Sequence, residues 1–145
     1  MASMTVPQIS QESAGPIPDQ KLLAEYVLLT AECARASMMC ADACLAARDI
    51  EPLRRCIRLA LDCADICEAT GRLLLRPHDP QPAVLHHLLE ALRLMCRACA
   101  AECSRHADRH EGCRICHEVC GRCAAASARL REALDRRSET APTQH

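Results

Sequence analysis

Apolar and cysteine positions recur at steps of three, four and seven residues through most of this chain, with charged residues between them. Such steps return a side chain to one face of an α-helix, because each residue turns the helix by about 100°. The pattern predicts four helices, over about residues 19–48, 52–76, 82–108 and 111–136. All eight prolines lie outside these stretches or at a helix start, where the missing backbone N–H is tolerated.

Cysteines form the apolar face of every predicted helix. There are 13 of them in 145 residues, and each group falls within a sector of roughly 40° to 80° on its helix. The four groups are Cys33, Cys40 and Cys44; Cys56, Cys63 and Cys67; Cys96, Cys99 and Cys103; and Cys113, Cys116, Cys120 and Cys123. The spacing of the first group recurs 23 residues later in the second. Duplicated helical hairpins with short links predict an all-α fold, an antiparallel up-down-up-down four-helix bundle with a cysteine-lined interior.

Beyond the cysteines, the same helix faces carry larger side chains. These are Leu22, Tyr26 and Leu29 before the first group, Thr70 and Leu74 after the second, Leu85, Leu89 and Leu92 before the third, and Ser127, Leu130 and Leu134 after the fourth. Because consecutive helices alternate in direction, these continuations meet at one end of the bundle. We therefore expect a bundle with thiols in one half and hydrocarbon in the other.

Length and composition predict one bundle domain, residues 19–137, between two polar ends. Residues 1–18 and 138–145 are expected to be disordered tails. The first of these has no basic start and no apolar core of a secretory signal, so we expect a cytoplasmic protein with reduced thiols. The net charge of −1 and the lack of an apolar run of membrane-spanning length argue against nucleic-acid and membrane partners.

So many inward-facing thiols have several explanations. Packing as small hydrophobic residues accounts for one or two cysteines, but not for a sulfur at nearly every layer of four helices. A disulfide scaffold stays open, although an odd number of cysteines and a cytoplasmic location disfavour it. A zinc-stabilised structure also stays open, although structural zinc prefers isolated tetrahedral sets. A thiol oxidoreductase is the remaining alternative, with Cys113 near a helix start as its one well-placed thiol.

Rows of thiols along straight helices suit cuprous copper best, because Cu(I) is a soft ion that favours thiolate ligands. The rows predict a protein that stores multiple Cu(I) ions through all 13 cysteines and has no catalytic step. His106 and His110 lie in the link at the thiol-rich end, and we expect them to be ligands that pass copper inward from a donor. Met39 and Met95 are expected to serve in packing, and His117 lies at the edge of its cysteine stripe.

Two segments resemble the bacterial copper storage proteins, specifically their cytosolic branch. They are Cys56-Ile57-Arg58-Leu59 with Cys63-Ala64-Asp65-Ile66-Cys67, and Glu102-Cys103 followed by a histidine-containing link and the cysteines Cys113, Cys116, Cys120 and Cys123. The resemblance covers about residues 20–136. It implies a four-helix bundle whose interior cysteines bind many Cu(I) ions, assembled as a homotetramer. Ser37, Ala60 and Ser127 occupy face positions where cysteine-richer members could carry a thiol, which predicts a lower capacity than theirs.

Overall fold

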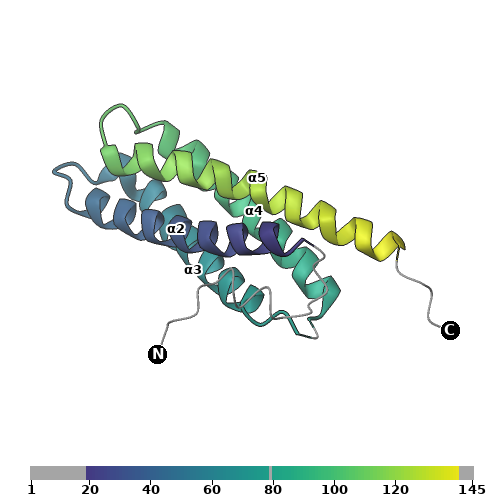
Figure 1. Cartoon of the computed structure of the whole chain (residues 1–145). Helices are drawn as coiled ribbons and strands as arrows, with labels where there is room; N and C mark the ends of the chain where they lie inside the picture. Colours follow the sequence, from purple (N-terminus) through teal and green to yellow (C-terminus); the bar gives the residue numbers. More distant parts are fainter. Residues whose placement is uncertain (1–18, 79, 141–145) are drawn as a thin grey trace.

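The computed structural model describes residues 19–78 and 80–140. These residues form four α-helices and one short 3₁₀-helix (Figure 1), namely α2 (Gln20–Leu45), η1 (Glu51–Leu53), α3 (Arg54–Leu74), α4 (Pro82–Ser104) and α5 (Glu111–Thr140). The described ranges contain no β-strand. The predicted all-α, four-helix architecture is therefore confirmed.

The helix starts follow from the local sequence. Asp19 caps α2, since its carboxylate accepts a hydrogen bond from the backbone N–H of Leu22 at 3.0 Å. Pro52 lies in the η1 turn that leads into α3, and Pro82 is the first residue of α4. At a first helical turn the missing N–H of proline leaves no hydrogen bond unmade, so both prolines mark a start rather than a break.

The helix ends differ from the sequence prediction by up to four residues. Helix α5 continues to Thr140, so residues 138–140 are helical and the expected C-terminal tail began too early. Helix α4 stops at Ser104, because the chain then forms tight turns in which the N–H of His106 bonds to the carbonyl of Cys103 at 3.0 Å. The expected disorder of residues 1–18 and 141–145 lies outside the described residues.

The helices pack as an antiparallel up-down-up-down bundle. Helix α2 packs against α3 and α5, and α4 packs against the same two helices. The α2–α3 and α4–α5 links therefore lie together at one end of the molecule, at the left in Figure 1. We call this end, formed by residues 46–53 and 105–110, the mouth.

The interior has two halves, as predicted. Cysteines fill the half next to the mouth, and large side chains fill the other, namely Leu23, Tyr26, Leu74, Leu85, Leu89, Leu92 and Leu130. Leu22, Leu29 and Leu134, which the sequence pattern also placed inside, are only partly buried and pack against this core. The hydrocarbon half holds the four helices together through contacts that involve no thiol.

Small polar groups occupy the boundary between the two halves. The hydroxyls of Tyr26 and Ser127 lie 2.6 Å apart and share a hydrogen bond, while Thr30 and Thr70 donate to backbone carbonyls of their own helices. Gly71 allows α3 to approach α2 here, since a Cβ at this position would lie 2.7 Å from Thr30 Oγ1. Burial raises the pKa of Tyr26, so its hydroxyl stays neutral.

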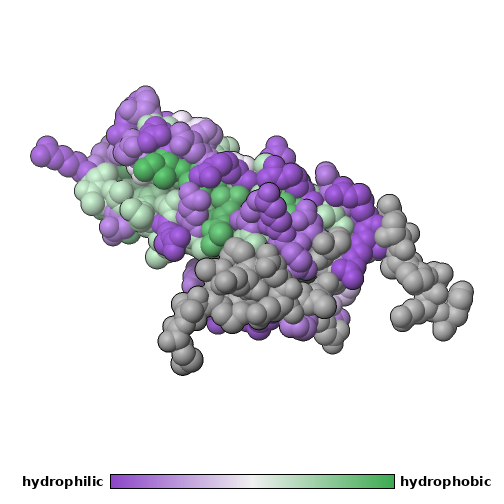
Figure 2. Space-filling model, in the orientation of Figure 1, coloured by the Kyte–Doolittle hydropathy of each residue, from purple (hydrophilic) through white to green (hydrophobic). Residues whose placement is uncertain are grey.

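The outer surface is mainly hydrophilic, with apolar patches on the face formed by α2 and α5 (Figure 2). Helix α2 contributes four exposed large apolar side chains, namely Leu28, Met38, Met39 and Leu45. None of the described helices is long and apolar enough to cross a bilayer.

Candidate metal centre

All thirteen cysteines face the interior of the bundle. Each is at most 2% exposed, and each of the helices α2, α3, α4 and α5 contributes at least three of them. The sequence predicted this because helical steps of three, four and seven keep the thiols on one face. Four such faces turned toward a common axis bring together sulfurs that are far apart in the sequence, such as those of Cys33 and Cys120, which are separated by 87 residues.

The sulfurs form an unbroken row from the mouth toward the centre. Successive Sγ atoms along it are 3.5 to 4.0 Å apart. The row runs through Cys44, Cys113, Cys56, Cys103, Cys99, Cys116, Cys120, Cys33, Cys96 and Cys67. Cys40 joins it through Cys113, and Cys63 joins it through four neighbouring thiols. Cys123 is fully buried and interacts with the inner end of the row.

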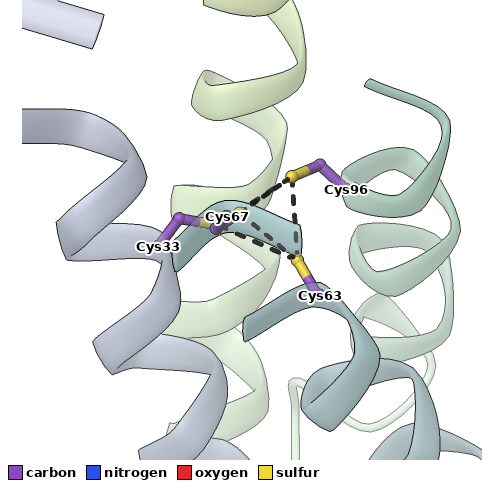
Figure 3. Close-up of side chains that lie close together, drawn as sticks. All are labelled: Cys33, Cys63, Cys67 and Cys96. Atoms are coloured by element: carbon purple, nitrogen blue, oxygen red, sulfur yellow. Dashed lines mark hydrogen bonds between the residues drawn. The ribbon is translucent and has the colours of Figure 1, made fainter. Parts of the chain in front are cut away.

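Four groups of thiols are compact enough to hold a metal ion. In each group the Sγ atoms lie within 4.8 Å of one another. The groups are Cys33, Cys63, Cys67 and Cys96, shown in Figure 3; Cys40, Cys44, Cys56 and Cys113; Cys40, Cys103 and Cys116; and Cys63, Cys99 and Cys120. Cys40 and Cys63 each belong to two groups, so neighbouring sites share ligands.

The sulfur spacing matches the geometry of metal–thiolate sites. A metal–sulfur bond of about 2.3 Å separates two sulfurs on one ion by about 3.8 Å in a tetrahedral site, 4.0 Å in a trigonal site and 4.6 Å in a linear site. The observed contacts of 3.5 to 4.0 Å therefore need little movement to accept ions. Soft ions that each accept two or three thiolates can share sulfurs with the ions of neighbouring groups along the whole row.

Burial and hydrogen bonds between thiols both shift the pKa values of the cysteines. Burial raises the pKa of Cys44 and of Cys113, because a thiolate is poorly solvated inside the bundle. Cys56 is the contrary case at the mouth, since hydrogen bonds from neighbouring thiols, first among them Cys103, lower its pKa, and His106 acts in the same direction. A bound metal ion replaces thiol protons, so loading the row with metal must release protons.

The alternative explanations of the cysteines find little support in this geometry. All thirteen thiols are free, and the shortest Sγ–Sγ distance among the contacts, 3.5 Å between Cys56 and Cys103, far exceeds a disulfide bond of about 2.05 Å. Shared ligands are unlike the isolated tetrahedral sets of structural zinc. Cys113, the thiol proposed for redox chemistry, is fully buried and its pKa is raised, whereas reactive cysteines are accessible and have a lowered pKa.

The three positions that lack an expected thiol are also inside. Ser37, Ala60 and Ser127 are at most 1% exposed. Ser37 interrupts the sulfur lining at mid-row, with its Oγ 3.7 Å from Cys116 Sγ and 3.9 Å from Cys120 Sγ. Hydroxyl and methyl groups at these positions leave gaps among the soft ligands.

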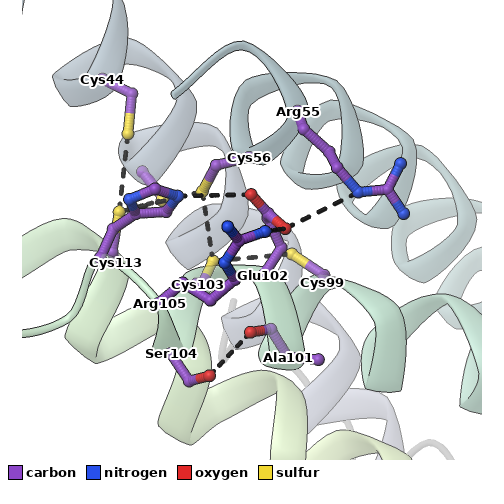
Figure 4. Close-up of polar contacts among 12 residues, drawn as sticks. Cys44, Arg55, Cys56, Cys99, Ala101, Glu102, Cys103, Ser104, Arg105 and Cys113 are labelled. Carbon is purple, nitrogen blue, oxygen red and sulfur yellow. Dashed lines mark hydrogen bonds and ion pairs between the residues drawn. The ribbon is translucent and has the colours of Figure 1, made fainter. Parts of the chain in front are cut away.

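The two histidines expected at the thiol-rich end lie at the mouth. His106 and His110 are both partly buried, and the N–H of His110 bonds to the carbonyl of His106 at 2.9 Å. Neither belongs to a compact thiol group. The Nε2 atom of His106 instead faces the carboxylate of Glu102 at 3.3 Å. Figure 4 shows Glu102 beside Cys56 and Cys103, with Arg55 and Arg105 around it.

Other soft or titratable residues lie away from the row. His117 bonds to the carbonyl of Ala100 through Nδ1 at 2.9 Å. The expected packing role of Met39 is wrong, because its side chain is 72% exposed on the outer face of α2. Met95 is partly buried and packs against the core, as expected. Glu102 was not among the predicted site residues, because its ion pair with Arg55 joins two different helices and has no signal in the local sequence.

A four-helix bundle with a continuous row of interior thiols, in groups compact enough to hold metal ions, defines a protein that binds several soft metal ions inside its own fold. The family model described as copper storage protein matches residues 19–132, and the chain belongs to this family. The predicted fold and the predicted role in copper storage are both confirmed at this level. No curated protein matches the chain.

Solved structures agree with the family assignment. The chain is similar to the copper storage protein Ccsp of Streptomyces lividans loaded with 10 copper equivalents, with a TM-score of 0.85 and 36% identity over 89% of this chain and 99% of that one. A second structure describes copper loading, with five coppers, to this cytosolic protein; it has a TM-score of 0.75 and 39% identity over 77% and 93% of the two chains. A variant of the same protein with two histidines replaced by alanine has a TM-score of 0.78 and 37% identity over 82% and 99%.

Proposed function

We propose that this protein stores Cu(I) as a bridged thiolate row inside the bundle, with all thirteen cysteines as ligands. The observation that carries the proposal is the continuity of the row, in which every step is 4.0 Å or shorter from Cys44 to Cys67. Continuity matters because a bridging sulfur serves two ions, which raises the number of ions per thiol. A capacity on the order of one ion per thiolate follows, and the related protein of S. lividans was loaded with 10 copper equivalents.

His106 and His110 are the proposed ligands through which copper reaches the row. They lie four residues apart in the mouth, next to the outermost thiols, and His106 influences the pKa of Cys56. The related protein was studied with two histidines replaced that are also four positions apart. Imidazole nitrogen binds Cu(I) less strongly than thiolate does, so an ion held there is drawn inward.

The cellular setting of this store is proposed as cytoplasmic, as described for the related S. lividans protein. Copper enters from a donor and leaves to an acceptor through the mouth, with no catalytic step. We also propose a homotetramer. The exposed apolar side chains of α2, namely Leu28, Met38, Met39 and Leu45, offer a surface for contact between copies. Light scattering of the purified apoprotein measures this, and a monomer at all concentrations would contradict it.

Anaerobic titration of the reduced apoprotein with Cu(I), in competition with a high-affinity Cu(I) chelator, tests the storage function. The expected result is tight binding of many ions, with a stoichiometry close to the number of thiols. The same titration with Zn(II) is the control for metal preference. Binding of only one or two Cu(I) ions, or tighter binding of zinc, would exclude storage of copper in a bridged row.

A further inference from the structure

One carboxylate lies inside the mouth, next to the thiols. Glu102 is 7% exposed and is the one charged residue that is buried among the residues whose side chains are described. It precedes Cys103, whose Sγ lies 3.5 Å from that of Cys56. Burying a carboxylate is costly unless ionic and hydrogen-bonding partners satisfy it. Its partners therefore indicate what it does.

The two oxygens of Glu102 have different partners. Oε2 faces two guanidinium groups, Arg105 Nη1 at 3.4 Å and Arg55 Nε at 3.7 Å. Oε1 faces Nε2 of His106 at 3.3 Å. Figure 4 shows the carboxylate between Arg55 and Arg105, on the side of α4 that faces the mouth thiols. The arginines come from α3 and from the α4 end, so they fix the carboxylate while leaving Oε1 to the histidine.

This arrangement determines which nitrogen of His106 is available. A carboxylate only accepts hydrogen bonds, so Nε2 must carry the proton that points to Oε1. In the neutral imidazole the lone pair is then on Nδ1. A carboxylate that holds a histidine in this way fixes both its tautomer and its ring orientation for metal binding. The carboxylate itself is a hard ligand and binds Cu(I) poorly, so its effect on copper acts through the histidine.

We propose that Glu102 is a positioning residue, which holds His106 in the Nε2–H tautomer so that Nδ1 receives copper at the mouth. This inference depends on the proposed role of His106 as a mouth ligand. It differs from a purely structural role, in which Glu102 would only tie α3 to α4 through Arg55 and brace the end of α4 through Arg105.

The test is a set of uptake rates, measured anaerobically as Cu(I) moves from its bathocuproine disulfonate complex to the full-length apoprotein. Glu102→Leu removes the acceptor and should slow uptake on the order of 10- to 100-fold, the usual effect of losing the carboxylate behind a metal-binding histidine. Glu102→Gln keeps an acceptor oxygen and should restore part of the rate. Total capacity should stay unchanged in both. Glu51→Gln is the matched control, because Glu51 also pairs with an arginine three residues on but is exposed and forms no ion pair with a histidine.

A double-mutant cycle distinguishes a positioning role of Glu102 from a purely structural one. In a His106→Ala background, Glu102→Leu should cause no further loss of rate, because the residue through which it acts is gone. Equal slowing by Glu102→Leu in both backgrounds would overturn the proposal and leave the structural role. A normal rate for His106→Ala itself would instead contradict the proposed role of the histidine, so the two failures are distinguishable.

Nitrogen NMR gives a readout that does not depend on uptake, and its main measurement is made on the wild-type protein. The ¹⁵N shifts of His106 in the wild-type apoprotein should show a protonated Nε2 and an unprotonated Nδ1, and in Glu102→Leu they should change toward a mixture of tautomers. His117, which contacts a backbone carbonyl through Nδ1, serves as the internal reference for the opposite tautomer. A protonated Nδ1 on His106 in the wild type would overturn the proposal directly.

Discussion

Ser37→Cys should add one copper site at the middle of the row. The Ser37 hydroxyl and the thiols of Cys116 and Cys120 form a triangle with sides of 3.7, 3.9 and 3.7 Å. Three sulfurs around one ion at about 2.3 Å form a triangle with sides of about 4.0 Å. The Ser37 side chain therefore occupies the position of the third ligand of a trigonal site, but its ligand atom is oxygen rather than sulfur.

Anaerobic titration against a strong competing chelator measures the effect, and the expected gain is about one tightly bound Cu(I) per chain. Ser37→Ala should have the same capacity as the wild type, because the hydroxyl of Ser37 does not serve as a copper ligand. Ser104→Cys places a thiol on the exposed end of α4 and controls for a gain from any added cysteine. An unchanged capacity in Ser37→Cys, or a gain no larger than that of Ser104→Cys, would show that sulfur spacing does not set the capacity.

Three further outcomes follow from the fold and the mouth. Gly71→Ala should destabilise the apoprotein, because overpacking against Thr30 costs about 1–3 kcal/mol and outweighs a helix-propensity gain of about 1 kcal/mol. In a Thr30→Ala background, Gly71→Ala should instead stabilise the apoprotein. Thermal unfolding measures both effects. Tyr26→Phe should lower the free energy of unfolding by about 1 kcal/mol through loss of its buried hydrogen bond, with copper capacity intact, and a lost copper equivalent would contradict this. Replacing His106 and His110 together by alanine should slow copper uptake or release in chelator exchange while capacity stays nearly intact; a large loss of capacity would make them storage ligands instead.

The sequence was sufficient to predict the thiol lining, because helical periodicity alone decides which side chains share a face. Cys33 and Cys120, for example, follow from stripes that can be counted in the sequence. The burial of Thr30 beside Gly71 could not be predicted in the same way, since it depends on how closely α2 and α3 approach. The spacing of residues along a helix determines which side chains share a face, whereas the distance between two helices depends on how their side chains pack.

The mouth was the least predictable part of the site. Glu102 precedes Cys103 and has the sequence character of an ordinary surface position on a helix. In the structure it is 7% exposed and pairs with Arg55 from another helix. The end of α4 at Ser104 carries no glycine or proline signal, so the histidine link was expected to be partly helical. Leu53, 1% exposed in the η1 turn, was likewise not expected in the core. The burial of Glu102 and of Leu53 comes from contacts between segments, whereas α4 ends where the chain forms local turns. None of these features follows from a repeat in the sequence.

Because half of its interior is hydrocarbon, this protein depends less on bound metal for its folding than small zinc domains do. Such domains unfold when their metal is withdrawn, because the ion supplies most of their folding free energy. Here the leucines around Leu89 and Leu92, both fully shielded from solvent, keep the scaffold assembled while the opposite half is being filled or emptied. The chain can thus be made before any copper arrives, and one copy can serve through many rounds of surplus and scarcity.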